Sequence, residues 1–162
     1  MALNAYLNLT GETQGKIKGS VTKAGREDSI KVIAVNHEVV SPRDTASGLP
    51  TGKRQHKPIT ITKEVDKSSP LLYQVLTNNE NITEWALQFW RPSRSGKKFQ
   101  FYTVELVNAS ISDIQFEMLN NKYPENKKHR EREHVSFVYQ KIIWTWQDGG
   151  ITAEDDWETP VV

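Results

Sequence analysis

Apolar and polar residues alternate along most of the chain, and this pattern predicts a mainly β protein. Residues 3–9 (LNAYLNL) place leucine or alanine at every second position, which is typical of a half-buried strand. Further stretches rich in β-branched or aromatic residues follow at 16–22, 29–40, 58–65, 81–91 and 99–119. Turn sequences such as GETQG and AGRED separate them. Strands with a turn about every 8–12 residues indicate an antiparallel barrel or sandwich of roughly seven to nine strands.

One segment, residues 69–79, has the pattern of a helix instead. Ser69 is a suitable N-cap and Pro70 suits the first helical position. The apolar stripe that follows consists of Leu71, Leu72, Val75 and Leu76. Asn78 and Asn79 suit the end of a helix, so we expect a single α-helix within the β fold.

Residues 134–150 (HVSFVYQKIIWTWQDGG) depart from simple alternation, because both sets of alternate positions contain large apolar side chains. Residues 99–119 share this feature and are long enough for one bent strand or two. A strand that is apolar on both sides is expected where one face packs in the core and a helix or a second subunit covers the other. One helix cannot cover every such strand, so the pattern predicts an oligomer.

Composition limits the class of protein. A chain of 162 residues can form one domain with a proper core, and its five Trp, five Tyr and five Phe exclude a disordered chain. The net charge of +1 lacks the basic excess of a nucleic-acid binder. Without cysteine, neither a disulfide nor a thiolate metal site can form. Residues 1–15 show no signal peptide and no apolar run of about 18 residues is present, so we expect a cytoplasmic domain without membrane insertion.

Charge is unevenly distributed along this nearly neutral chain. Residues 41–58 form a long loop with three prolines, four basic residues and one acidic residue, a net charge of +3. A second polar loop, residues 120–133, has five basic and three acidic residues, a net charge of +2. The tail, residues 147–162, has five acidic residues, a net charge of −5, and is expected to be only partly ordered. These charges could pair between copies of the chain or only keep it in solution.

No group of residues predicts catalysis, a metal site or a cofactor site. His129 and His134 bracket the segment HREREH at the end of the polar loop, which lacks the H-E-x-x-H spacing of a zinc site on a helix. Asp155 and Asp156 are adjacent carboxylates, but they lie in the tail without a rigid scaffold, which general acid–base catalysis needs. An enzyme such as a β-barrel hydrolase, or a lectin, would need a concave polar site that the sequence does not reveal.

Three motifs follow one another along the chain: Y-L-x-L…G-x-I-x-G-S in residues 6–20, T-G-x-R-x-H-x-P in residues 51–58 and K-E-x-D-x-S-S-P-L-L in residues 63–72. In this order they resemble the Hcp (haemolysin-coregulated protein) family, the tube subunits of bacterial type VI secretion. The likeness continues through FYTVELVNASI and YQKIIWTWQDGG, so it covers nearly the whole chain in order.

The resemblance implies a single β-barrel domain over residues 1–146 that forms hexameric rings, which stack into a hollow tube. It implies that a contractile sheath expels the tube, tipped by a spike, with small effectors inside. The implied partners are further copies of the chain and the spike, sheath and effector proteins. The implied route runs from the bacterial cytoplasm to the medium or a target cell without a signal peptide. A phage-like tail tube subunit is the alternative. Only 16 residues follow Trp146, too few for a toxin domain, so we expect a structural subunit rather than an enzyme.

Two loops are the candidate sites under this resemblance. Residues 41–58 correspond to the family's extended loop, which reaches adjacent subunits or rings. The residues expected to contribute to stacking are Arg43, Lys53, Arg54, His56 and Lys57. The second loop is a candidate for the lumen or an interface through Asn120, Lys122, Lys127, Lys128 and Arg130.

Overall fold

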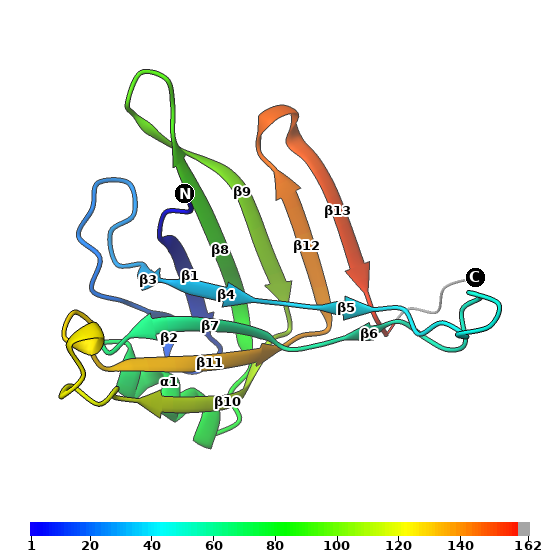
Figure 1. Ribbon diagram of the computed structural model, residues 1–162, viewed down its shortest axis with the longest axis horizontal. Coiled ribbons are helices and arrows are strands. Elements are labelled where there is room, and N and C mark those ends of the chain that lie inside the picture. Colours follow the sequence, from blue (N-terminus) through cyan, green and yellow to red (C-terminus); the bar gives the residue numbers. More distant parts are fainter. Residues whose placement is uncertain (159–162) are drawn as a thin grey trace.

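A computed structural model describes residues 1–158 as two antiparallel β-sheets packed against each other (Figure 1). The strands of the larger sheet are β1 (Ala5–Gly11), β2 (Gly15–Ile17), β3 (Ile30–Val32), β8 (Ile82–Pro92), β9 (Lys98–Val107), β12 (Lys141–Trp146) and β13 (Ile151–Asp156). The strands of the smaller sheet are β4 (Ala34–Asn36), β7 (Ile59–Glu64), β10 (Ser110–Glu117) and β11 (Arg132–Val138). The remaining elements are the paired strands β5 (Val39–Val40) and β6 (Gln55–His56), the helix α1 (Ser69–Thr77), and the 3-10 turns η1 (Pro124–Asn126) and η2 (Asp148–Gly150).

The strand order confirms the predicted mainly β, antiparallel fold in its sandwich form. The larger sheet has the order β13-β12-β9-β8-β1-β2, with β3 also paired to β1. The smaller sheet has the order β10-β11-β7-β4. The sheets do not close into a barrel, and α1 packs against β10 beside the smaller sheet (Figure 1).

Three pairs of consecutive strands pass directly from one sheet to the other: β3 to β4, β9 to β10, and β11 to β12. The second passage is short because Asn108 adopts a left-handed φ of 51° between the two strands. Residues 99–119 are therefore two strands. The third passage divides residues 134–150 at Tyr139 and Gln140, so the expectation of one long strand there was wrong.

This division explains the apolar residues on both alternations of residues 134–150. In β11, Val135 and Phe137 are buried, as is Tyr139 just after the strand, whereas in β12 the buried residue is Ile142. The inward-facing set changes from odd to even positions where the chain changes sheets. A second subunit is therefore not needed to explain this pattern, although the end of β12 projects beyond the smaller sheet.

The core lies between the two sheets and is closed by α1. Trp85 of β8 packs edge-on against Phe137 of β11, with ring centroids 5.4 Å apart, and both side chains are buried. Leu72 and Val75 of α1 are buried in the same cluster. Burial of such side chains contributes about 1.5–3 kcal/mol each, so this contact between sheets is the main stabilising feature of the fold.

The motif K-E-x-D-x-S-S in residues 63–69 builds a buried ion cluster. The Lys63 side chain is completely buried, and its Nζ donates to Glu133 Oε1 and Ser69 Oγ, both at 2.9 Å. Asp66 Oδ1 lies 3.1 Å from the same Nζ. Glu133 therefore belongs to a buried strand, not to the polar loop. The N-cap of α1 is Ser68, not Ser69 as predicted, and the Ser69 hydroxyl instead contacts Glu133 and Lys63.

Two glycines in the first motif allow close backbone packing. A Cβ atom at Gly19 would lie 2.3 Å from the Ser29 carbonyl oxygen, and one at Gly11 would lie 2.0 Å from Glu80 Oε2. The same Glu80 oxygen accepts the backbone N–H of Gln14 at 3.1 Å and so orders the β1–β2 turn. A side chain at either glycine would displace these contacts.

The tail is more ordered than expected. After the turn at Gly149 and Gly150, which adopt φ values of 80° and 65°, β13 pairs with β12 along all six residues. The acidic composition of the tail concealed this strand. Residues 159–162 lie outside the described residues.

The buried cluster makes a stability prediction. Replacing Lys63 by Met leaves the Glu133 carboxylate buried without its cation, which costs about 3–5 kcal/mol of unfolding free energy. The matched control is Lys31→Met, because Lys31 pairs with Glu64 at 2.9 Å while 43% exposed, and an exposed pair contributes about 1 kcal/mol or less. Urea unfolding at equal protein concentration measures both. Equal losses in the two variants would contradict the assigned role of the cluster.

Candidate functional site

The loop at residues 41–58 forms a narrow ribbon that projects from the body of the molecule (Figure 1). Val39 pairs with His56 at its base, and Arg43 bridges to Pro50 further out. At the tip, the Asp44 carboxylate accepts the backbone N–H of Ser47 at 2.8 Å. The predicted extended loop is thus a preorganised hairpin rather than an unstructured segment.

Arg54 fastens the base of the ribbon to β13. Its Nε and Nη2 donate to the two carboxylate oxygens of Asp155 at 2.5 and 2.9 Å, and Nη2 also donates to the Asp156 carbonyl at 2.9 Å. The Arg54 side chain is only 17% exposed. The Arg54 guanidinium holds the pKa of the Asp155 carboxyl below its ordinary value. Bidentate pairs of this kind fix geometry as well as charge.

Two histidines complete this attachment around one phenol. His56 Nε2 lies 2.7 Å from Asp155 Oδ2, and its Nδ1 lies 3.0 Å from the Tyr139 hydroxyl. His37 Nε2 lies 2.7 Å from the same hydroxyl. The indole N–H of Trp157 donates to the Tyr139 carbonyl. We call the group Arg54, His56, His37, Tyr139 and Asp155 the ribbon anchor.

Burial affects the ionisation of the anchor. It lowers the pKa of His37, and the neighbouring His56 lowers it further. Burial and the Asp155 charge raise the pKa of Tyr139 well above its ordinary value, so the phenol stays protonated. The neutral forms of His37 and Tyr139 are favoured in the folded protein.

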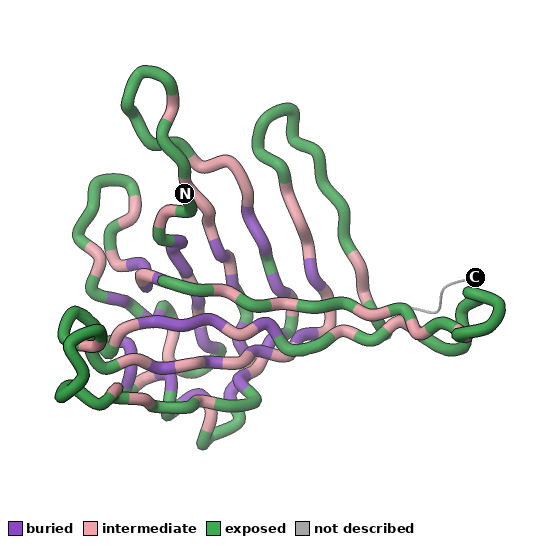
Figure 2. Tube along the Cα trace, in the orientation of Figure 1, coloured by how far each residue is buried: buried purple, intermediate pink, exposed green. Residues whose placement is uncertain are grey.

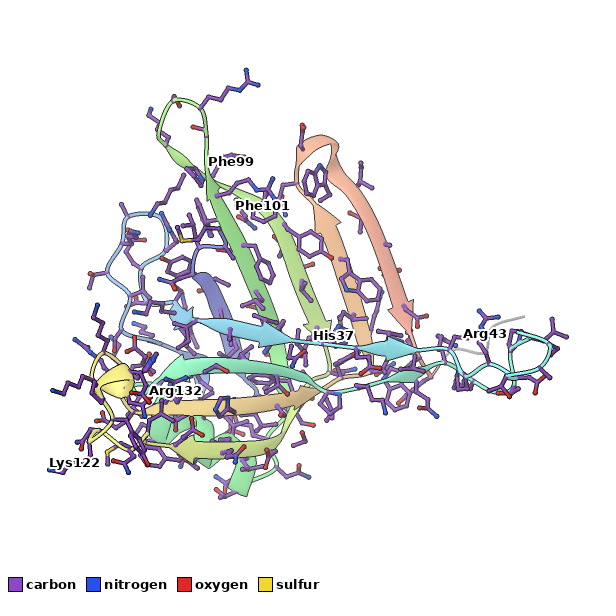
Figure 3. All side chains as sticks on the ribbon, viewed as in Figure 1. His37, Arg43, Phe99, Phe101, Lys122 and Arg132 are labelled. Atoms are coloured by element: carbon purple, nitrogen blue, oxygen red, sulfur yellow. The ribbon has the colours of Figure 1, made fainter. Side chains whose placement is uncertain are left out.

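The predicted site residues fall into three groups. Arg54 and His56 are within the anchor, whereas Arg43, Lys53 and Lys57 are exposed along the ribbon. The second loop lies at the opposite end of the molecule, as Arg43 and Lys122 show in Figure 3. Its predicted members, all exposed, are Asn120, Lys122, Lys127, Lys128 and Arg130. The structure does not bring the two loops together. Sequence reasoning missed Tyr139, and it did not connect Asp155 with the ribbon.

A second surface was not predicted as a site. Figures 1 and 2 show that β8, β9, β12 and β13 extend past the smaller sheet, with less burial toward these ends. We call the apolar group there the apolar shelf. Its residues are the exposed Phe99 (43%), Trp146 (40%) and Ile151 (67%), together with the half-buried Phe101.

The apolar shelf has defined internal packing. Trp146 pairs with both Tyr102 and Ile151 across neighbouring strands, so these side chains share one face of the sheet. The Phe101 and Trp146 rings meet edge-on at 6.0 Å, and the Arg91 guanidinium lies 3.6 Å above the Phe101 ring. A preorganised aromatic surface with an arginine is typical of protein–protein contacts.

One pocket and two histidines were candidates for chemistry, and within residues 1–158 no group of His, Cys, Asp and Glu that could hold a metal ion is found. A pocket of about 480 Å³ is lined by the Lys31–Glu64 ion pair and by Arg130, without a histidine beside a nucleophile. His134 Nδ1 is within 2.9 Å of the Thr62 hydroxyl, and His129 is exposed in the polar loop. In the described part of the chain, no helix is long and apolar enough to cross a membrane.

Comparison with known proteins settles the family. The family model described as "Type VI secretion system effector, Hcp" matches residues 6–146. The "Major exported protein" of Pseudomonas aeruginosa is 42% identical over 170 aligned positions, which cover 99% of each chain. The chain belongs to the Hcp family.

Solved Hcp structures agree with this assignment. A crystal structure of an Hcp protein superposes with a TM-score of 0.89 at 34% identity, covering 97% of this chain and 99% of the other. A variant of the Hcp1 protein from Escherichia coli EAEC 042 gives a TM-score of 0.85 at 32% identity, covering 96% and 99%. Hcp proteins are secreted structural tube proteins of type VI secretion rather than enzymes, so the resemblance noted in the sequence is confirmed.

The ribbon anchor makes a pH-dependent prediction. Asp155→Asn removes the charge-assisted partner of Arg54 and lowers the unfolding free energy at pH 7 by about 1–2 kcal/mol. Because folding lowers the pKa of Asp155, its contribution is present above the ordinary value of 3.8 and is lost as the pH falls below it. Urea unfolding should therefore give a lower unfolding free energy for Asp155→Asn than for the parent protein at pH 7, and similar values for both in acid. A difference that persists unchanged at low pH would contradict this role.

Proposed function

We propose that this Hcp chain is the structural subunit of the inner tube of a type VI secretion system. Six copies form a ring, the rings stack into a hollow tube, and sheath contraction expels the tube with small effectors in its lumen. Its partners are other copies of itself and the spike, sheath and effector proteins of the apparatus. The subunit is made in the bacterial cytoplasm and leaves with the tube. The apolar shelf is the observation that carries this proposal.

The apolar shelf supports lateral contact between copies. Chains that act alone seldom expose several large aromatic groups together, and here the shelf lies at the side of the larger sheet that ends in β13. Strand β13 is the terminal strand of that sheet, and among residues 1–158 no further strand pairs with its outer edge. Free edges of this length invite pairing with another chain. A contact can join two different surfaces of successive copies. Such a contact produces a closed ring when the rotation from one copy to the next is a whole-number fraction of 360°.

The ribbon supports contact between rings. It projects as a preorganised hairpin, and its exposed basic residues are Arg43, Lys53 and Lys57. Arg54 and His56 serve this function indirectly, because they hold the base of the ribbon in place. Anchoring reduces the entropy lost when the tip docks on a neighbour. The second loop remains our candidate for a lumen or interface segment.

A phage-like tail tube subunit would use the same ring and stack architecture. The family match over residues 6–146 and the high identity to an exported Pseudomonas protein favour the secretion apparatus. A sheath or spike gene beside the gene for this chain would distinguish the two machines.

Acidic substitutions on the apolar shelf should prevent ring formation. Phe99→Asp with Ile151→Asp should weaken each lateral contact by about 2 kcal/mol or more, as for other interface anchors. Both side chains are exposed in the single chain, at 43% and 67%, so the circular dichroism spectrum should not change. Light scattering should show loss of the ring. Phe116→Asp is the control, since Phe116 is 57% exposed on β10 of the other sheet. An intact ring in the double variant would refute the lateral contact.

Charge reversal on the ribbon should prevent the stacking of rings without preventing ring formation. Arg43→Glu with Lys53→Glu reverses charge on the projecting part while leaving Arg54 in the anchor. Rings of normal mass should form, but stacks should be absent from negative-stain images. The control is Lys16→Glu with Lys18→Glu, two exposed residues outside both loops, which should retain stacks. Tubes of unchanged length in the ribbon variant would show that the ribbon charges do not serve stacking.

A further inference from the structure

The ribbon anchor contains two histidines that share one phenolic oxygen, an arrangement that tube assembly alone does not require. The Tyr139 hydroxyl lies 2.7 Å from His37 Nε2 and 3.0 Å from His56 Nδ1, and 3.4 Å from the Lys57 carbonyl. The two histidines come from different sides of the ribbon base: His37 precedes β5 and His56 ends β6. Figure 3 places His37 where the β4–β5 segment leaves the body of the molecule.

The protons of the anchor can be assigned from its acceptors. The Asp155 carboxylate accepts only, so His56 Nε2 carries a hydrogen toward it. In this tautomer the His56 Nδ1 accepts the Tyr139 hydroxyl hydrogen, and His37 Nε2–H donates to the Tyr139 oxygen. The Tyr139 hydroxyl then donates to one histidine and accepts from the other.

A proton added to His37 is not matched by an anion. Protonated His37 donates from Nε2 to the Tyr139 oxygen and places a positive charge next to the His56 ring, and burial together with His56 lowers the pKa of His37. His37 faces the Tyr139 phenol and the His56 ring, whereas His56 faces Tyr139 and the Asp155 carboxylate, which also binds Arg54. Asp155 is already shared between Arg54 and His56, so His37 gains no anion.

We propose that His37, Tyr139 and His56 form a proton-operated clasp that holds the ribbon at neutral pH and releases it in acid. The His56 side chain is 1% exposed and His37 is half-buried, so a charge on His37 lies partly out of solvent beside the His56 ring. Closure disfavours protonation of His37, and so the clasp is stable above the pKa of a free histidine, about 6.5, and weakens as the pH falls below it. Each pH unit below that value raises the open-to-closed ratio by up to about tenfold.

The clasp closes within one chain, so it stands independently of ring and tube assembly. The chain has no cysteine, and Ala46 near the ribbon tip is exposed. A dye attached to Ala46→Cys would therefore report the local motion of the ribbon through time-resolved anisotropy. The same label in the Arg43→Glu, Lys53→Glu background, where stacking is blocked, separates release of the clasp from loss of stacks.

Between pH 8 and pH 5.5, the amplitude of fast motion should rise at least threefold in the labelled chain. His37→Gln, which keeps a hydrogen-bonding side chain without titrating, should abolish the rise. Tyr139→Phe should give high mobility at both pH values, and His129→Gln in the exposed loop should behave as the parent. A flat response in the parent, or the same rise in His37→Gln, would overturn the proposal. Loss of the β-sheet circular dichroism signal in parallel with the rise would also overturn it, because the whole fold would then be opening.

Discussion

The passage of three strand pairs between the sheets is the constraint on which the other features depend. Because β3, β9 and β11 lead directly into strands of the other sheet, the two sheets are joined at their corners and cannot slide into full overlap. Strands β8, β9, β12 and β13 of the larger sheet therefore extend beyond the smaller sheet (Figure 1). The core and the exposed aromatic surface are two parts of the same sheet face.

The points where strands pass from one sheet to the other also position the ribbon and the ribbon anchor. Tyr139 lies at the passage from β11 to β12, and β13 folds back along β12 to bring Asp155 beside Arg54. The ribbon thus leaves the body at a point held by charge-assisted hydrogen bonds, while the shelf lies on the uncovered part of the same sheet. In this arrangement the apolar shelf is suited to lateral contact, and the projecting ribbon is suited to contact with a molecule farther from the body of the chain.

The local sequence predicted the strands and the helix better than it predicted the contacts between residues distant in the chain. Alternation located most strands and the apolar stripe located α1, but it continued through Tyr139 and hid a change of sheet. The Lys63–Glu133 pair was not predicted because 70 residues separate its members. Arg54 and His56 were assigned to an exposed interface because nothing nearby in the chain indicates Asp155. Strand β13 was missed because its acidic residues resemble a solvated tail, whereas pairing with β12 orders it.

The central claim is that the uncovered sheet face is buried between copies of the chain. The most direct measurement is the solution mass of the purified protein by light scattering, with negative-stain images of the same peak. A mass near six times 18.5 kDa with hollow ring-shaped particles is the expected result. A stable monomer at micromolar concentration would contradict the claim, because the aromatic surface would then have no partner.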